Sequence, residues 1–246
     1  VMFRETDHLG DWARHLIKTA VVLGALVGVY QVVAVANSTS MPSSPSPSAS
    51  APASRPMTPE EMAVASYNSG ISHRDKATKA EVQVTKDKKG SDKLKNTKKA
   101  REEHEKALKD FMKASELNPS LPQAWNGLGY SYRKLGDYAK ALENYDRALQ
   151  LAPNFPDAIE YRGEAYLGLN RLDDAKQAYL TLFGIDRKQA DSLMAAMKDY
   201  VAQKKTDPTG VDAAALTAFE SWMNERAGVA EQTKLMAFNA HHGSWR

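Results

Sequence analysis

The chain has 246 residues, of which 42% are hydrophobic and 26% charged, and this fits one soluble folded domain better than a multi-span membrane protein. A formal net charge of +3 is too small to indicate nucleic-acid binding by itself. The chain has no cysteine, which excludes disulfide bonds, cysteine-ligated zinc and a thiol nucleophile.

An apolar stretch lies near the start of the chain. Residues 20–36 carry no charge, Arg14 and Lys18 precede them, and the next basic residue is Arg55. This asymmetry predicts that the remainder of the chain crosses to the far side of a membrane. The stretch is short for a spanning helix and ends in a small-x-small pattern that signal peptidases accept. We therefore expect residues 1–36 to be a signal peptide or a single membrane anchor, with the protein periplasmic or anchored in the inner membrane facing the periplasm.

Residues 37–59 are dominated by proline, serine and alanine and show no periodic apolar face. Such a segment buries too little apolar surface to offset the entropy of ordering it. We expect a disordered linker that lets the folded part stand away from the membrane.

The strongest signal in the sequence is a repeat with a period of 34 residues. Small residues and large aromatic residues recur at fixed places and are followed by a proline. The signature residues are Gly70 and Ala107 in the first repeat, Trp125, Gly129, Tyr132, Ala141, Tyr145, Ala148 and Pro153 in the second, and Gly163, Tyr166, Ala175 and Tyr179 in the third. The pattern W-x2-L-G-x2-Y, then A-x3-F/Y-x2-A and a proline, resembles the tetratricopeptide-repeat family, bacterial envelope type.

The resemblance implies an all-α right-handed superhelix of about three helix pairs with C-terminal capping helices. A small residue such as Gly129 lets the first helix of a pair press closely on the second, and Tyr145 fills the gap between layers. Each pair leaves one face bare, so the pairs must stack. The expected repeat region is 60–190, divided into 60–120, 121–155 and 156–190, with capping helices and a tail at 191–246.

The first repeat is interrupted. Gly70 and Ala107 are 37 positions apart, whereas the matching Gly129 and Ala141 are 12 apart, so about 25 residues are inserted. The insertion at 76–101 is charged and favours helix, with a turn signal at 89–91. We expect a helical hairpin that extends beyond the first repeat.

The inserted region is basic, with 11 Lys and Arg against 6 Asp and Glu between residues 76 and 106. One interpretation is a basic arm that binds anionic lipid or an envelope polymer. The other is a solvated hairpin whose charges pair along each helix. Aromatic residues are absent from this region, which argues against nucleic-acid binding.

After the repeats, the sequence predicts a helix at 191–204 opened by an Asp191 cap, a second at 211–227 and a short third at 231–239. Terminal helices of a repeat array cover the last hydrophobic layer, so a capping role is expected. The alternative is a docking surface of their own, built from three aromatic residues: Trp222, Phe238 and Trp245.

The sequence contains no phosphate-binding loop, no paired-histidine zinc motif and no nucleophile elbow. His73 and His104 could approach one another across the first repeat, yet no carboxylate pattern accompanies them. We therefore expect a non-enzymatic protein with no metal, cofactor or small-molecule substrate. An enzyme with an unrecognised site remains an alternative, and it would require a deep polar pocket.

In the family, side chains of the first helix of each pair line a concave groove that binds a protein or an extended peptide. The resemblance carries this role to Tyr67, Asn68, Ile71 and Arg74, to Gln123, Asn126, Tyr130, Arg133 and Lys134, and to Asp157, Glu160, Tyr161 and Glu164. The groove is expected to run from basic to acidic and to suit a ligand of mixed charge. The expected function is an interaction scaffold or assembly factor of a bacterial cell envelope.

Some family members hold the acidic C-terminus of chaperones in a clamp of lysine, asparagine and arginine. The matching positions here are Tyr67, Ile71, Gly127, Asp157 and Tyr161. This clamp is absent, and Asp157 would repel a carboxylate.

Overall fold

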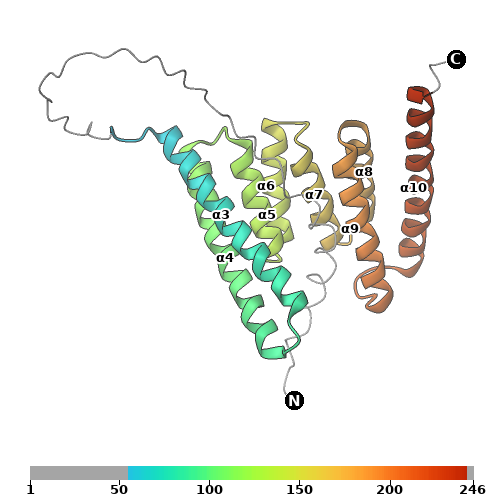
Figure 1. Cartoon of the computed structure of the whole chain (residues 1–246), viewed down its shortest axis with the longest axis horizontal. Helices are drawn as coiled ribbons and strands as arrows, with labels where there is room; N and C mark the ends of the chain where they lie inside the picture. Colours follow the sequence, from blue (N-terminus) through green and yellow to red (C-terminus); the bar gives the residue numbers. More distant parts are fainter. Residues whose placement is uncertain (1–54, 243–246) are drawn as a thin grey trace, which may run out of the picture.

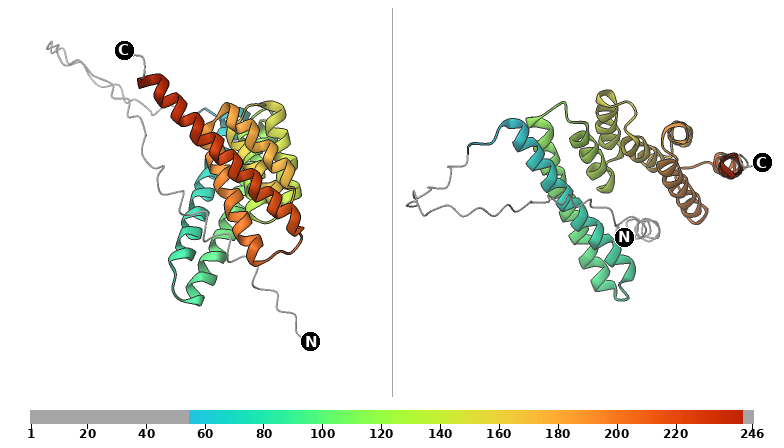
Figure 2. Two further views of the ribbon diagram at one scale, coloured as in Figure 1. Left: turned by 90° about the vertical axis from the view of Figure 1, so that its right-hand side faces the viewer. Right: turned by 45° about the horizontal axis from the view of Figure 1, so that its top comes forward.

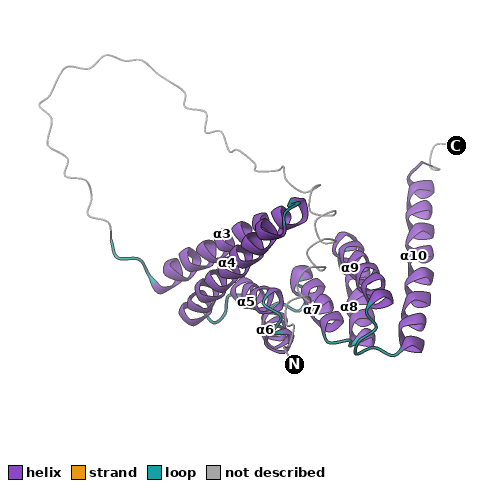
Figure 3. Ribbon diagram, turned by 90° about the horizontal axis from the view of Figure 1, so that it is seen from below, coloured by secondary structure: helices purple, strands orange, loops and turns teal. Residues whose placement is uncertain are grey.

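The computed structural model describes residues 55–242, and the regular structure in this range is entirely helical (Figure 1 and Figure 3). The helices are α3 (Pro59–Lys86), α4 (Gly90–Leu117), α5 (Pro122–Lys134), α6 (Tyr138–Leu151), α7 (Pro156–Gly168), α8 (Leu172–Ile185), α9 (Arg187–Thr206) and α10 (Ala213–His242). They form successive packed pairs, α3 with α4, α5 with α6 and α7 with α8, followed by α9 and α10.

The expected signal peptide or anchor at 1–36 lies outside the described residues, as does most of the expected linker at 37–59. Within residues 55–242, no helix combines the length and apolar character needed to cross a membrane.

Short-range chemistry fixes where the helices begin. Thr58 and Glu61 form a reciprocal capping box at the start of α3. The side chain of Asp137 caps α6 by accepting a hydrogen bond from the backbone of Lys140. The expected Asp191 cap is wrong, because the side chain of Asp186 accepts from the backbone N–H of Gln189 and so starts α9 at Arg187.

Within the pairs, small residues allow close helix contact. A Cβ atom added at Gly129 would lie 2.5 Å from the ring of Tyr145, which is fully buried on α6. In the preceding pair, a Cβ atom at Gly70 would lie 2.6 Å from Phe111 on α4. The signature alanines Ala107, Ala141, Ala148 and Ala175 are all fully buried, so the repeat signature marks the closest contacts of the fold.

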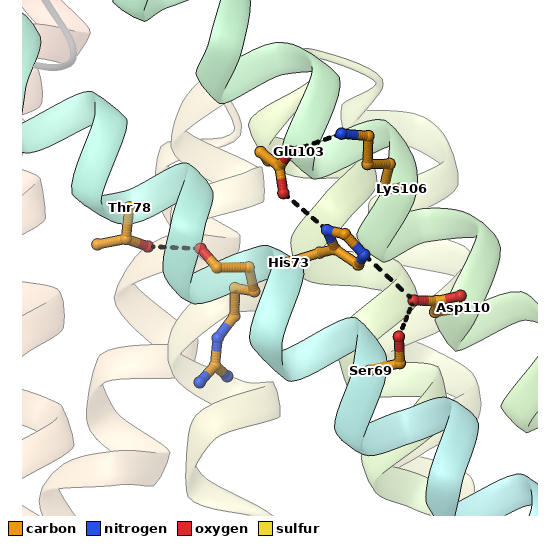
Figure 4. A network of polar contacts seen from close by, with 7 residues as sticks. Ser69, His73, Thr78, Glu103, Lys106 and Asp110 are labelled. Atoms are coloured by element: carbon orange, nitrogen blue, oxygen red, sulfur yellow. Dashed lines mark hydrogen bonds and ion pairs between the residues drawn. The ribbon is translucent and has the colours of Figure 1, made fainter.

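The first pair is a hairpin of two 28-residue helices, about twice the length of α5 and α6. Its tip projects beyond the other helices (Figure 2). A polar network joins the two helices (Figure 4): His73 Nδ1 lies 2.7 Å from Glu103 Oε2, and the Ser69 hydroxyl donates to Asp110. Lys106 also binds Glu103, and these two contacts hold the pKa of Glu103 at about 2.

The C-terminal helices close the last hydrophobic layer. Leu216, Phe219 and Met223 of α10 join the core cluster of α7, α8 and α9. Trp222 packs against this layer, with its ring 5.6 Å from that of Tyr179. The expectation of separate helices at 211–227 and 231–239 is wrong, because α10 is continuous. Trp222 therefore serves the cap, and the side chains of Phe238 and Trp245 lie outside the described residues.

We expect Gly129→Ala to lower the free energy of unfolding by about 1–3 kcal/mol, since its new methyl group must displace the fully buried Tyr145 ring. The control is Gly228→Ala in α10, where an added Cβ meets nothing within 4 Å and where alanine should stabilise the helix by up to about 1 kcal/mol. Urea unfolding of both variants measures the difference. Equal stability of Gly129→Ala and wild type would contradict the close contact.

Candidate functional site

The first helices of successive pairs, α3, α5 and α7, lie side by side, and α9 follows α7 in the same row. We call the surface that their groove-position residues form the A face. The predicted groove residues differ in exposure. The exposed ones are Asn68 and Gln123, the half-buried ones are Tyr67, Arg74, Tyr130, Lys134, Asp157 and Tyr161, and the buried ones are Asn126, Arg133, Glu160 and Glu164. The A face is thus a half-buried polar and aromatic surface that crosses three helices.

Arg133 of α5 organises the centre of the A face. Its guanidinium pairs with Glu164 of α7, and its Nε donates to the Tyr145 hydroxyl at 3.4 Å. The guanidinium also lies 5.2 Å from the ring centres of both Tyr130 and Tyr161, within cation–π range. Burial alone would lower the pKa of Arg133, but Glu164 raises it well above its usual range, so the side chain stays charged.

Lys134 of α5 is neutralised by the extended first repeat. Its ammonium lies 2.8 Å from Glu81 Oε2, and Nε2 of the buried His104 lies 2.9 Å from Glu81 Oε1. Burial would raise the pKa of Glu81, but the bond to His104 and the charge of Lys134 lower it to about 2. Burial also lowers the pKa of His104, which is therefore neutral at pH 7.

The sequence showed no carboxylate pattern beside the two histidines, yet in the structure Glu103 contacts His73 and Glu81 contacts His104. Both carboxylates lie in or beside the charged insertion, where the sequence suggests only solvent-exposed charges. Glu103 follows His73 by 30 residues and Glu81 precedes His104 by 23, and the folded hairpin brings each pair into contact. No group of three metal-ligating His, Asp or Glu side chains forms within the described part of the chain.

These ion pairs change the expected charge of the A face. Arg133 and Lys134 were expected to form its basic end, but both are satisfied by internal carboxylates. Arg74 is the remaining cation of the face; it is 34% exposed, pairs with its neighbour Asp75 and lies 6.0 Å from the centre of the Tyr130 ring. The gradient from basic to acidic is thus weaker than the sequence indicates.

The acidic end lies on α7, beside the start of α9. Asp157 accepts a hydrogen bond from the Gln189 side chain, which leaves its charge in place. Glu160 is 8% exposed. Burial, and then the neighbouring charge of Glu164, raise the pKa of Glu160 to about 8. A carboxyl group on the A face is thus held largely protonated at pH 7.

Away from the A face, the hairpin tip is strongly basic. Nine lysines lie between residues 76 and 99, against Glu81, Asp87 and Asp92. Glu81 turns inward to Lys134, and Asp87 accepts hydrogen bonds from Gln83 and Asn96. None of the nine lysines forms an ion pair within residues 55–242. Leu94, at 72% exposure, stands among them.

A hollow of about 460 Å³ lies between the start of α5 and the loop that joins α6 to α7. Its lining is Pro122, Gln123, Ala152, Pro153, Asn154, Phe155 and Pro156, none of which titrates. It therefore does not provide the deep polar pocket that a hidden catalytic site would need.

Comparison with known proteins agrees with this architecture. A family model described as "Tetratricopeptide repeat" matches residues 122–155, and one described as "TPR repeat" matches residues 96–136. Residues 96–155 therefore carry tetratricopeptide repeats, which generally serve as protein-interaction scaffolds. The comparison with curated proteins found no match.

Two solved structures are similar to the chain. The NMR structure of the first TPR domain of human RPAP3 is 17% identical, with a TM-score of 0.43, and the match covers 60% of this chain and 98% of that one. The first TPR of Spaghetti (RPAP3), solved with the HSP90 peptide SRMEEVD, is 18% identical with a TM-score of 0.38, covering 54% and 93%.

We expect Glu160→Gln to stabilise the protein at pH 8 but not at pH 5. The carboxyl pKa is about 8 in the folded state and about 4.5 when unfolded, so unfolding releases a proton between these values. The contribution of Glu160 to stability therefore falls as pH rises through this window. Glutamine does not ionise, so Glu160→Gln should raise the free energy of unfolding by roughly 1–3 kcal/mol at pH 8.

Urea unfolding at both pH values measures this effect. The matched control is Glu143→Gln, which changes an exposed carboxylate on α6 and should leave stability within about 0.5 kcal/mol at either pH. An equal effect of Glu160→Gln at pH 5 and pH 8 would contradict the raised pKa.

Proposed function

We propose that this protein binds an extended segment of another protein along the A face, as a non-enzymatic scaffold or assembly factor of a bacterial cell envelope. The observation that carries the binding proposal is the row of half-buried tyrosines Tyr67, Tyr130 and Tyr161 on three successive helices. The Tyr130 and Tyr161 rings meet edge to face with their centres 5.3 Å apart. Tyrosine supplies large contact area and a hydrogen bond at low entropy cost.

Packing holds these tyrosines ready for a ligand. Tyr67 lies 5.7 Å from the ring of the buried Phe111, and the Tyr130 and Tyr161 rings flank the Arg133 guanidinium. Side chains already fixed in position lose little further entropy when a partner binds. The half-exposed Arg74 adds a donor beside Tyr130 that peptide carbonyls or carboxylates could use.

The cellular part of the proposal rests on the sequence. The apolar stretch 20–36 and the preceding Arg14 and Lys18 favour export, and the segment 37–59 would tether the repeats. Protease added to spheroplasts should then digest the repeats, and protection by the inner membrane would contradict this location.

We expect the variant Arg74→Ala/Tyr130→Ala to lose peptide binding while it stays folded. The probe is a displayed library of random 12-residue peptides, panned on the full chain. Wild type should enrich a common motif, and the variant should bind the enriched peptides at least about tenfold more weakly, since truncating central aromatic and arginine contacts often costs more than 1 kcal/mol each.

The matched control is Tyr132→Ala/Arg147→Ala. It removes the same residue types from another surface, where Lys140 lies 5.4 Å from the Tyr132 ring centre and Arg147 lies 5.9 Å from that of Trp125. Thermal unfolding of both variants separates lost binding from lost folding. Absence of any enriched motif on wild type, or equal loss in the control, would sink the proposal.

The unpaired lysines and the exposed Leu94 favour a second candidate function at the hairpin tip, namely binding to anionic lipid or an envelope polymer. We expect binding to vesicles that contain phosphatidylglycerol to weaken steeply as salt rises from 50 to 500 mM. Lys88→Gln/Lys89→Gln/Lys93→Gln should weaken it further, and Lys109→Gln/Lys113→Gln, on exposed positions away from the tip, should not. Equal binding to neutral vesicles would rule out this function.

A further inference from the structure

One carboxylate of the A face has no partner. Glu160 is 8% exposed and makes no hydrogen bond or ion pair within residues 55–242. Among these residues, the side-chain atoms that are buried without a hydrogen-bond partner belong to His104, Asn126, Arg162 and Arg226, so the oxygens of Glu160 still reach solvent. A nearly buried carboxylate without a partner costs several kcal/mol when it ionises.

The nearest cation is already engaged. Arg133 acts on Glu160, but its guanidinium pairs with Glu164, one helical turn further along α7. The Tyr130 and Tyr161 rings cover Arg133 at 5.2 Å each, so it has little freedom to turn toward a second acid.

The other charged groups that act on Glu160 are acids. They are Asp157 and Glu164 on its own helix and Asp186 at the cap of α9. Both Asp157 and Asp186 accept hydrogen bonds from the neutral Gln189, and neither forms an ion pair with a described residue. Three acids and one arginine thus surround Glu160.

A second acceptor lies at the corresponding place on the neighbouring helix. Asn126 precedes Glu160 by 34 residues, one repeat period, and is 9% exposed. Its Oδ1 atom is buried without a hydrogen-bond partner in the described region. Unsatisfied buried acceptors are rare in folded proteins, because each costs roughly 1–3 kcal/mol. Two acceptors without a protein donor in the described region thus lie on adjacent helices of one face, where a bound ligand could supply donors.

We propose that Glu160 receives a lysine or arginine side chain of the bound peptide, and that Asn126 accepts a hydrogen bond from the same ligand. The proposal rests on the peptide-binding function of the A face and specifies the chemistry of one subsite. Asp157 adds negative charge beside it, and Tyr161 adds an aromatic face suited to a cation. A metal ion fits less well, because no three His, Asp or Glu side chains come together as ligands among the described residues.

The test starts from the peptides enriched by panning on the full chain. Wild type should enrich a motif with lysine or arginine at one fixed position. Replacing that residue by methionine should weaken binding to wild type by at least about 30-fold, because the ion pair between the peptide cation and Glu160 is lost. The same replacement should cost less than about threefold on Glu160→Gln. The matched control Glu143→Gln should discriminate the two peptides as wild type does.

The outcomes separate the two proposals. If no peptide is enriched on wild type, peptide binding by the A face is wrong and the subsite falls with it. If peptides are enriched without a fixed basic residue, the subsite alone is wrong. Equal discrimination of lysine from methionine by Glu160→Gln and wild type would also overturn it, because the cation would then lie elsewhere on the face.

Discussion

The missing side chain at Gly129 lets α5 lie against the Tyr145 ring, and this contact positions the centre of the A face. The hydroxyl of the same ring receives a hydrogen bond from Arg133, one helical turn beyond Gly129 on α5. Arg133 in turn pairs with Glu164 and lies between Tyr130 and Tyr161. Gly129, which serves helix packing, thus also positions Arg133 through Tyr145. The packing of the helices and the geometry of the A face therefore depend on the same contacts.

Internal ion pairs determine which charges of the A face are left for a ligand. Arg133 and Lys134 each meet an internal carboxylate, and this removes the two cations that dominate the sequence pattern of α5. Glu160 has no such partner, and its raised pKa is the cost of that arrangement. Stability would improve if a neutral residue stood there. Buried groups that lower stability in this way are most often found at binding sites.

The 34-residue spacing was enough to predict the helix pairs α5–α6 and α7–α8, because the signature residues are those that set helix contact. The spacing could not predict that Glu81 would reach Lys134, since that contact depends on how far the extended α3 continues beside α5. At the C-terminus, a break was expected between helices at 211–227 and 231–239. Gly228, which lies in this interval, is tolerated inside α10, because one glycine costs only about 1 kcal/mol in a helix. The expected cap of the next helix was Asp191, and the backbone register gives this role to Asp186 instead.

The unbroken course of α3 gives the protein a fixed internal spacing. The helix carries Arg74 on the A face and Lys86 at the hairpin tip, which places these two residues about 18 Å apart along its axis. Ligands held at the two places would be joined by a rigid rod and not by a flexible chain. Binding at one place would then raise the effective concentration of a partner at the second place only if the partner's own binding segments lie the same distance apart. The length of α3 would thereby set the distance between the two binding places.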